Sequence, residues 1–290
     1  KAIQNLDLMV VVDVIPSEIA GWADVVLPES VYLERYDDLN ASPFREGFVG
    51  IRQPVVDAPN DQKPNWWMAK KLGEKLGLGA YFPWKDVEDY LDTRLKLAGH
   101  SLDELKKEGI IKGPEKPIYF EDGVEPEFAT PSGKIEFYSK QLAEAGFDPV
   151  PRYTKHAEPP AGYFRLLYGR APVHTFSKTQ SNPILADMMS ENELWVNADL
   201  AERYGLKNGD RIKLKNQDGV ISDPIKVKAT ERIRQDCVYM VHGFGQKSRQ
   251  LRSTYKKGAS DAELVTKYNT DPLMGGTAMN VNFVTFEMEV

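Results

Sequence analysis

The segment from residue 193 to residue 241 constrains the fold more than any other part of the chain. It contains four short runs of apolar or alternating residues, a pattern that is typical of β-strands. These runs span residues 193–197, 211–216, 224–230 and 237–241. Turn signals lie at 208–210 and 218–219, and residues 199–204 read as a short helix that ends before Gly205. Strands this short, joined by frequent turns, favour a small closed β-barrel with one or two inserted helices.

A polar loop, residues 169–182, lies between a predicted strand at 164–168 and a predicted helix at 183–189. It has one arginine, one lysine, one histidine and several hydroxyl and amide side chains. The Arg170 guanidinium can bind a phosphate through paired hydrogen bonds, and hydroxyl and backbone N–H groups can fill the remaining acceptor sites. The loop therefore indicates an anion-binding site beside a helix N-terminus. The alternative is a polar surface loop whose last residues only cap the helix.

Glycine-rich segments at 242–245 and 275–282 adjoin predicted strands, and the second is followed by a terminal strand. Glycine lets a ligand approach the backbone closely. His242 is a candidate ligand-binding residue, and the alternative is an ordinary core or surface histidine. Asn280 and Asn282 share a face if the terminal strand begins early, and their amides can then read the edge of a heterocycle. The alternative for both asparagines is turn chemistry alone.

The first residues of the chain have a different pattern of apolar residues. Residues 6–15 form a near-continuous β-branched run, which is typical of a strand buried on both faces in a parallel sheet. A short helix-like segment at 16–23 and an apolar run at 24–28 complete a strand–helix–strand unit, which indicates an α/β region. Asp13 stands near the C-terminal end of the first strand, where open α/β sheets bind ligands. The alternative is a solvated strand-end carboxylate or a cap.

Residues 29–63 show no clear periodicity and are expected to be irregular. A structureless span of this length is usually functional or packed against another part of a protein. Three helices and two strands are predicted after it. The helices span 63–76, 86–97 and 102–107, and the strands span 117–120 and 134–138. The proline-rich segment 149–162 reads as a linker between domains.

Composition excludes several classes of function. The net charge of −6 argues against a nucleic-acid partner bound through a general basic field. No apolar run approaches the roughly 18 residues that a membrane-spanning helix needs, so direct membrane insertion is not expected. The single cysteine, Cys237, lies in an apolar run and is expected to be a small buried core residue. One cysteine can build neither an intrachain disulfide nor a thiolate zinc site or iron–sulfur cluster.

Several stretches together resemble the molybdopterin-dependent oxidoreductases of the dimethyl sulfoxide reductase superfamily. The resemblance rests on residues 10–28, 32–35, 169–170, 174–175, 195–201 and 206–210. Within the superfamily, the chain is most similar to the catalytic subunits of thiosulfate and polysulfide reductases. This second similarity rests on residues 173–180, 240–245 and 279–286. These segments are spread from the start to the end of the chain, and the resemblance extends over nearly all of it.

The resemblance implies two structural regions and a cofactor. Residues 1–150 would belong to the α/β molybdopterin oxidoreductase region that grips one dinucleotide, and residues 151–162 would be the linker. Residues 163–290 would form a double-psi β-barrel, the molybdopterin dinucleotide-binding domain, which lies across both pterins. The implied cofactor is bis(molybdopterin guanine dinucleotide) with molybdenum or tungsten.

The resemblance also assigns cofactor-binding positions. Those that would hold a guanosine end are Asp13, Arg35 and Asn65. Those in the pterin and phosphate loop are Gly169, Arg170, His174, Thr175, Ser177 and Thr179. The C-terminal pterin-binding turn is matched by Asn280 and Asn282, and His242 is a further match. No catalytic residue and no metal ligand is expected in this chain.

Two features of the family are absent from the sequence. Members carry an N-terminal cysteine cluster for a [4Fe–4S] centre, and this branch binds molybdenum through a protein cysteine. Cys237 matches neither, because it lies in the predicted barrel. The sequence is therefore expected to be the C-terminal part of a larger catalytic subunit, with the [4Fe–4S] cluster in the missing N-terminal part. By itself it is expected to be inactive.

The resemblance implies that the full-length enzyme reduces a sulfur–sulfur bond in anaerobic respiration, with the chemistry carried by the cofactor. The substrate would be a small sulfur oxyanion or polysulfide. An iron–sulfur electron-transfer subunit and a membrane anchor subunit would be the partners, at the periplasmic face of the cytoplasmic membrane. One alternative is arsenate, tetrathionate, nitrate or formate chemistry on the same scaffold. Another is a noncatalytic module that binds a nucleotide-like cofactor.

Overall fold

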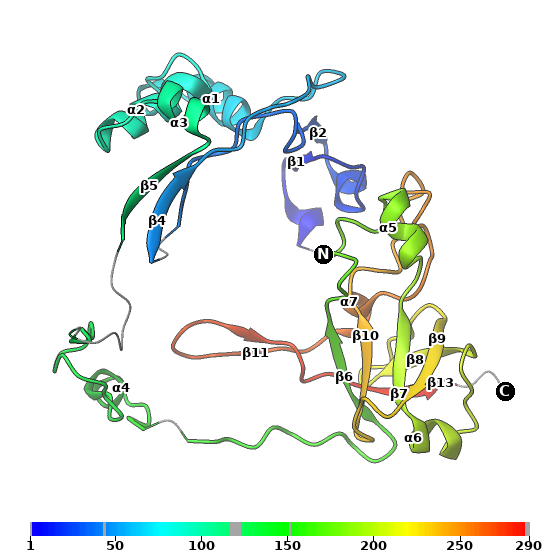
Figure 1. The fold of residues 1–290 in the computed structure, drawn as a ribbon. Coiled ribbons are helices and arrows are strands. Elements are labelled where there is room, and N and C mark those ends of the chain that lie inside the picture. Colours follow the sequence, from blue (N-terminus) through cyan, green and yellow to red (C-terminus); the bar gives the residue numbers. More distant parts are fainter. Residues whose placement is uncertain (1, 43–44, 116–122, 124, 151, 288–290) are drawn as a thin grey trace. The chain divides into compact units, whose positions relative to one another are not determined.

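The computed structural model describes residues 2–42, 45–115, 123, 125–150 and 152–287 (Figure 1). The chain divides into two compact units. The first unit comprises residues 1–15 and 22–152, and the second comprises residues 16–21 and 153–290.

A parallel pair of short strands lies near the start of the chain. β1 (Val10–Asp13) pairs in parallel with β2 (Val25–Pro28), and the 3-10 helix η2 (Ile19–Trp22) lies in their connection. This confirms the predicted strand–helix–strand unit. The prediction of a strand over residues 6–15 that is buried on both faces is wrong, because only Val11 in β1 is buried. Among the described residues this sheet has two strands, and Val10 and Val12 of β1 are exposed.

The second sheet of this unit joins segments that are distant in sequence. Strands β3 (Asn40–Ser42), β4 (Glu46–Gly50) and β5 (Ile110–Glu115) are antiparallel neighbours in that order. The expectation that residues 29–63 are irregular is therefore wrong for β3 and β4. Local periodicity could not reveal them, because β4 finds its partner β5 about sixty residues further along the chain.

Three helices of this unit form where the sequence predicts them. They are α1 (Asn65–Lys75), α2 (Val87–Leu97) and α3 (Leu102–Glu108), with the 3-10 helices η1 (Ile3–Asn5) and η3 (Gly79–Tyr81) elsewhere in the unit. The side chains of Asp86 and Ser101 accept hydrogen bonds from the first turns of α2 and α3, as N-caps do. The buried core of the unit consists of Leu91, Leu95, Leu102, Leu105 and Ile111.

Two further strands are predicted in this half of the chain, at residues 117–120 and 134–138. The strand predicted at 117–120 lies outside the described residues. The strand predicted at 134–138 is wrong, because that segment is irregular and is followed by helix α4 (Lys140–Glu144). Ile135 and Phe137 alternate with polar residues, as in a half-buried strand, but both side chains are exposed.

The second unit contains a closed barrel of six strands, as the sequence predicts (Figure 1). Its strands are β6 (Phe164–Gly169), β7 (Glu193–Asn197), β8 (Arg211–Asn216), β9 (Ile225–Thr230), β10 (Cys237–Val241) and β13 (Phe283–Glu287). Their order around the barrel is β10-β6-β13-β8-β9-β7, and β10 closes it by pairing with β7. The β6–β10 and β7–β9 pairs are parallel, and the other pairs are antiparallel.

The barrel core follows from the alternation of side chains along each strand. The interior is filled by aliphatic residues that are almost fully buried. They include Leu166, Leu194, Val196, Leu214, Ile225, Val227, Val238, Met240 and Val284. Short elements lie in the connections between the barrel strands. They are α5 (Pro183–Met188), α6 (Ala198–Arg203), α7 (Asp261–Leu264) and the hairpin of β11 (Asn269–Thr270) and β12 (Thr277–Ala278).

Cys237 is buried at the start of β10, as predicted. Burial raises the pKa of its thiol, which is therefore protonated at neutral pH. Within the described ranges, no helix has the length and apolar character needed to cross a bilayer.

Candidate functional site

Parallel pairing of β6 and β10 brings two loops together at the ends of these strands. The polar loop, residues 169–182, follows β6, and a glycine-rich turn, residues 242–246, follows β10. The His242 N–H donates to the Gly169 carbonyl at 3.0 Å. A Cβ atom on Gly169 would lie 3.2 Å from the Tyr239 hydroxyl oxygen, so a glycine suits this crowded strand end.

The two loops meet backbone to backbone at Phe176 and Gly243. Phe176 has a left-handed conformation with φ of 49°, which is uncommon for a residue other than glycine. Gly243 has φ of 87°, and a Cβ atom there would lie 2.5 Å from the Phe176 carbonyl oxygen. Only glycine fits this contact without a shift of the polar loop.

Buried glutamines hold the two loops in register. The Gln180 side-chain amide donates to the Phe176 carbonyl. The Gln246 side-chain amide donates to the Ser177 carbonyl at 3.0 Å and to the Gly243 carbonyl at 3.2 Å. These contacts fix the backbone of the polar loop, so its exposed groups are preorganised for a ligand.

His174 and Thr179 shape the polar loop from inside. His174 is only 4% exposed, and its Nε2 atom lies 2.8 Å from the Met189 carbonyl oxygen. Because a carbonyl only accepts, Nε2 carries the proton and Nδ1 accepts from the Thr179 hydroxyl at 3.2 Å. The Thr179 oxygen in turn accepts the Thr175 N–H at 2.9 Å. Both ring nitrogens of His174 are therefore used within the chain.

Several groups of the polar loop are available to a ligand. Arg170, Thr175 and Ser177 are exposed. The Arg170 guanidinium lies over the Phe176 ring, 4.9 Å from its centroid, and this cation–π contact leaves the N–H groups at its edge free to donate.

Two buried polar atoms beside Phe176 lack a hydrogen-bond partner in the described part of the chain: Gln180 Oε1 and His242 Nε2. The His242 and Phe176 rings meet edge to face at 4.9 Å. Buried polar atoms are normally paired, so orphaned ones at the meeting point of two preorganised loops point to a ligand. A polar heterocycle with a phosphate group fits this set of donors, acceptors and positive charge.

The two asparagines of the C-terminal segment have different surroundings. Asn280 is exposed. Asn282 is fully buried, and its side chain accepts from the N–H groups of Thr266 and Lys267 and donates to two carbonyls. β13 begins only at Phe283, so the condition for the two asparagines to share a strand face is not met. Asn280 can reach a ligand, whereas Asn282 ties the segment to the barrel.

The three site residues predicted in the first unit lie around the C-terminal ends of β1 and β2. Asp13 Oδ1 accepts the N–H groups of the two residues that follow it, at 2.7 and 3.2 Å. The Asp13 carbonyl accepts the Glu29 N–H at 3.1 Å, and Arg35 forms an ion pair with Glu29. Asn65 is exposed at the start of α1. Ser30 N–H donates to the Lys63 carbonyl, which brings the start of α1 to the same strand ends.

Sequence reasoning found the polar loop but missed the residues that hold it. Gln246 and Tyr239 were not selected, although the Tyr239 hydroxyl donates to the Arg170 carbonyl at 3.0 Å. Burial raises the pKa of Tyr239, which keeps this hydroxyl protonated as a donor. Among the described residues, no group of three or more His, Cys, Asp or Glu side chains could hold a metal ion.

Comparisons with known proteins agree with this architecture. Residues 164–283 match the family model described as "Molydopterin dinucleotide binding domain", and residues 1–75 match the model described as "Molybdopterin oxidoreductase". The thiosulfate reductase molybdopterin-containing subunit PhsA of Salmonella typhimurium is 33% identical over 95% of this chain and 39% of its own length. The putative dimethyl sulfoxide reductase chain YnfE of Escherichia coli is 27% identical over 97% of this chain and 38% of its own length.

A solved structure supports the fold. Acetylene hydratase from Pelobacter acetylenicus matches with a TM-score of 0.76 and 24% sequence identity, over 98% of this chain and 41% of that one. The chain thus spans about two fifths of the length of the proteins that it matches. From the two family models, the barrel and the 33% identical relative, we conclude that the chain belongs to the molybdopterin oxidoreductase family and carries its dinucleotide-binding domain.

Proposed function

We propose that the chain is the C-terminal cofactor-binding part of a molybdopterin-dependent thiosulfate or polysulfide reductase. The observation that carries the substrate class is the 33% identity to a thiosulfate reductase subunit along 95% of this chain. In the full-length enzyme, thiosulfate would take up two electrons and one proton, its sulfur–sulfur bond would break, and sulfite and hydrosulfide would leave.

The residues of the polar loop and the turn fit a bis(molybdopterin guanine dinucleotide) cofactor with molybdenum or tungsten. When bound, this group supplies two-electron redox chemistry at its metal. Arg170 would neutralise a pyrophosphate, while Thr175 and Ser177 would donate to its remaining oxygens. Gln180 and His242 would pair their buried, orphaned atoms with polar atoms of the cofactor.

Other chain residues would hold the ends of the cofactor. Asn280, which is exposed, would bond a pterin nitrogen or oxygen. Asp13 would accept from a guanine edge, with Arg35 and Asn65 contributing to a guanosine site at the same strand ends. His174 and Thr179 would act by shaping the polar loop, because their side chains already pair with each other and with the chain.

The proposal includes partners and a location. Electrons would arrive from an iron–sulfur subunit and from a [4Fe–4S] cluster elsewhere in the catalytic subunit. A membrane anchor subunit would hold the complex at the periplasmic face of the cytoplasmic membrane. The thiosulfate reductase relative is itself described as a subunit, which supports an assembly of this kind.

The test is a substrate panel on the full-length enzyme with reduced viologen dye as the electron donor. We expect thiosulfate or polysulfide to give the highest kcat/KM, by at least about tenfold, because discrimination between substrates of different shape and charge is commonly worth more than 1.4 kcal/mol. Dimethyl sulfoxide, arsenate, tetrathionate and nitrate are the comparison acceptors, and formate is tested as a donor. A preference for one of these comparison substrates would overturn the assignment of thiosulfate or polysulfide.

A second candidate is dimethyl sulfoxide reduction. It is favoured by the 27% identity to a putative dimethyl sulfoxide reductase chain over 97% of this chain. The same substrate panel separates the two candidates.

A further inference from the structure

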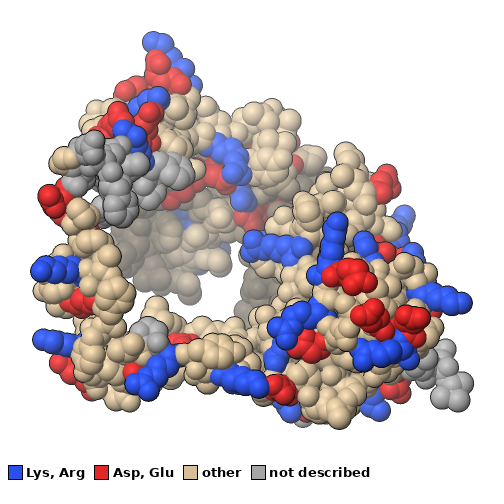
Figure 2. Space-filling view, turned by 60° about the horizontal axis from the view of Figure 1, so that its bottom comes forward, with Lys and Arg blue, Asp and Glu red and all other residues tan. Residues whose placement is uncertain are grey.

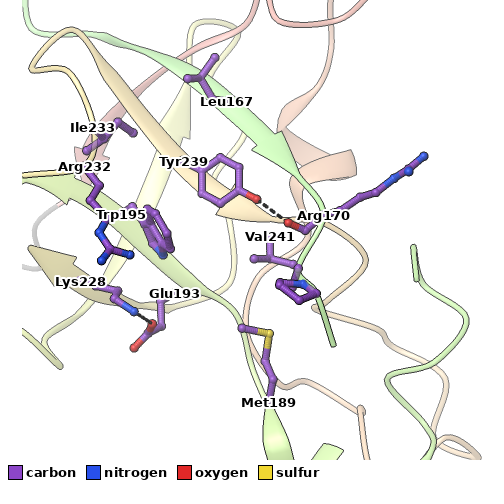
Figure 3. A pocket seen from close by; sticks show the side chains of 12 residues that line it. Leu167, Arg170, Met189, Glu193, Trp195, Lys228, Arg232, Ile233, Tyr239 and Val241 are labelled. Atoms are coloured by element: carbon purple, nitrogen blue, oxygen red, sulfur yellow. Dashed lines mark hydrogen bonds and ion pairs between the residues drawn. The ribbon is translucent and has the colours of Figure 1, made fainter. Parts of the chain in front are cut away.

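The outer wall of the barrel carries a pocket of about 380 Å³ (Figure 3). Its floor comes from neighbouring strands, with Leu167 on β6, Trp195 on β7, Lys228 on β9 and Tyr239 on β10. The adjacent residues along these strands are buried in the barrel core, so alternation turns these four side chains outward. The pocket therefore lies on the outer surface of the barrel, and it reaches the start of the polar loop, because Arg170, Ala171 and Pro172 also line it.

The floor of the pocket is aromatic and aliphatic. The Trp195 and Tyr239 rings meet edge to face with centroids 5.4 Å apart. Met189 and Ile233 border them (Figure 3). Such a surface gains from being covered, because apolar area removed from water contributes roughly 25 cal/mol per Å².

Positive charge lies along one edge of the pocket. Lys228 lies 5.3 Å from the Trp195 ring centroid and forms an ion pair with Glu193 at 3.2 Å. Arg232 is exposed, and its guanidinium has no ion pair or hydrogen bond within the described part of the chain. The Arg170 guanidinium points away from the pocket (Figure 3). Arg232 is thus the cation that remains to be matched by an occupant.

This charge is local to the pocket. The whole chain carries a net charge of −6, and Figure 2 shows basic and acidic side chains interspersed over the face in view. An unpaired arginine, Arg232, beside a tryptophan, a tyrosine and a methionine is a composition enriched at the centres of protein–protein interfaces. The orphaned atoms of the polar loop, Gln180 Oε1 and His242 Nε2, do not line this pocket.

We propose that this pocket docks an acidic segment of a second polypeptide. An apolar side chain of that segment would cover Trp195 and Tyr239, and a carboxylate beside it would pair with Arg232. The proposal rests on the proposed function only in that a multi-subunit enzyme would supply the second polypeptide.

The experiment places the photo-crosslinking residue p-benzoylphenylalanine at Ile233, on the rim of the pocket, in the full-length enzyme purified with its partners. Irradiation followed by mass spectrometry identifies what lies over the pocket. We expect a crosslink to a segment of another polypeptide that contains Asp or Glu next to an apolar residue. A crosslink to the enzyme's own polypeptide, to a segment without Asp or Glu, or to nothing would overturn the proposal.

Reversing the charge of Arg232 measures how much its ion pair contributes to binding of the partner. We expect Arg232→Glu to weaken binding of the crosslinked partner by about tenfold or more, since like charges brought together at an interface are costly. The matched control is Lys207→Glu, which makes the same charge change at an exposed residue outside the pocket. Equal binding by the two variants would contradict the pairing with Arg232. Cofactor content and substrate reduction are measured in parallel, so failure of the docking proposal is distinguishable from failure of the proposed function.

Discussion

Replacing Gly243 by alanine is expected to displace the polar loop and to strip the full-length enzyme of its molybdopterin cofactor. The new Cβ would lie 2.5 Å from the Phe176 carbonyl oxygen and 2.9 Å from the Gln180 side-chain nitrogen. Left-handed strain at φ of 87° adds to this clash. Together they cost about 2–5 kcal/mol, which the loops can relieve only by moving apart.

The matched control for this change is Gly219→Ala. Gly219 has the same φ of 87°, but a Cβ there meets nothing within 4 Å. The control should therefore lose only the strain, about 1–2 kcal/mol, and keep its cofactor. Molybdenum and guanine nucleotide per subunit, measured on both variants, report the result. Equal cofactor content in the two variants would show that the contact between Gly243 and Phe176 does not position the site.

The second large effect is expected at Asn282. Truncation to alanine removes a fully buried amide that pairs with the backbone of Thr266, Lys267 and Met279. Each buried group left unsatisfied costs about 1–3 kcal/mol, so Asn282→Ala should lose at least about 3 kcal/mol. Native-state hydrogen exchange of amides in β6 and β13 measures this loss, because both strands adjoin Asn282.

Asn280→Ala provides the contrast for the same segment. Asn280 is exposed, so its truncation should change barrel stability by less than about 0.5 kcal/mol. It should speed loss of the cofactor about fivefold, the equivalent of one hydrogen bond of about 1 kcal/mol. If the two variants changed places, with Asn280→Ala unfolding the barrel and Asn282→Ala leaving it intact, the assigned roles would be wrong.

The barrel could be predicted from sequence because its information is local. Alternation along β8 and β9 and the turns near Gly209 and Gly219 reflect burial and backbone geometry within a few residues. Helix α5 is likewise signalled by its own cap, since the Asn182 side chain accepts N–H groups of the first turn.

The missed elements depend on distant partners. β4 is a strand because β5 pairs with it, and residues 134–138 are not one because no neighbouring strand pairs with them among the described residues. The run at 6–15 shows the same limit, because its composition predicts burial on both faces but Val10 and Val12 are exposed in the two-stranded sheet. The hydrophobic pattern of a segment indicates which side chains it can bury. Whether they are buried depends on the strands and helices that pack against the segment.

The candidate site likewise contains residues that a local sequence pattern reveals and residues that depend on distant parts of the chain. Arg170 and the hydroxyls beside it were recognisable, because cationic and polar side chains without an apolar anchor suit an anion. The support of the loop was not recognisable, because Gln246 and Gly243 lie more than sixty residues further along the chain. Buried Asn282 and exposed Asn280 show that two like residues at neighbouring positions can have different roles once one of them is enclosed.

The central claim is that the polar loop and the glycine-rich turn at the ends of β6 and β10 bind the molybdopterin cofactor. Hydrogen–deuterium exchange of the full-length enzyme tests it directly, comparing protein made with the cofactor and protein from a host that cannot make molybdopterin. We predict protection of amides in residues 170–180 and 242–246 when the cofactor is bound, with β8 and β9 unchanged. Equal exchange of both loops in the two preparations would contradict the claim.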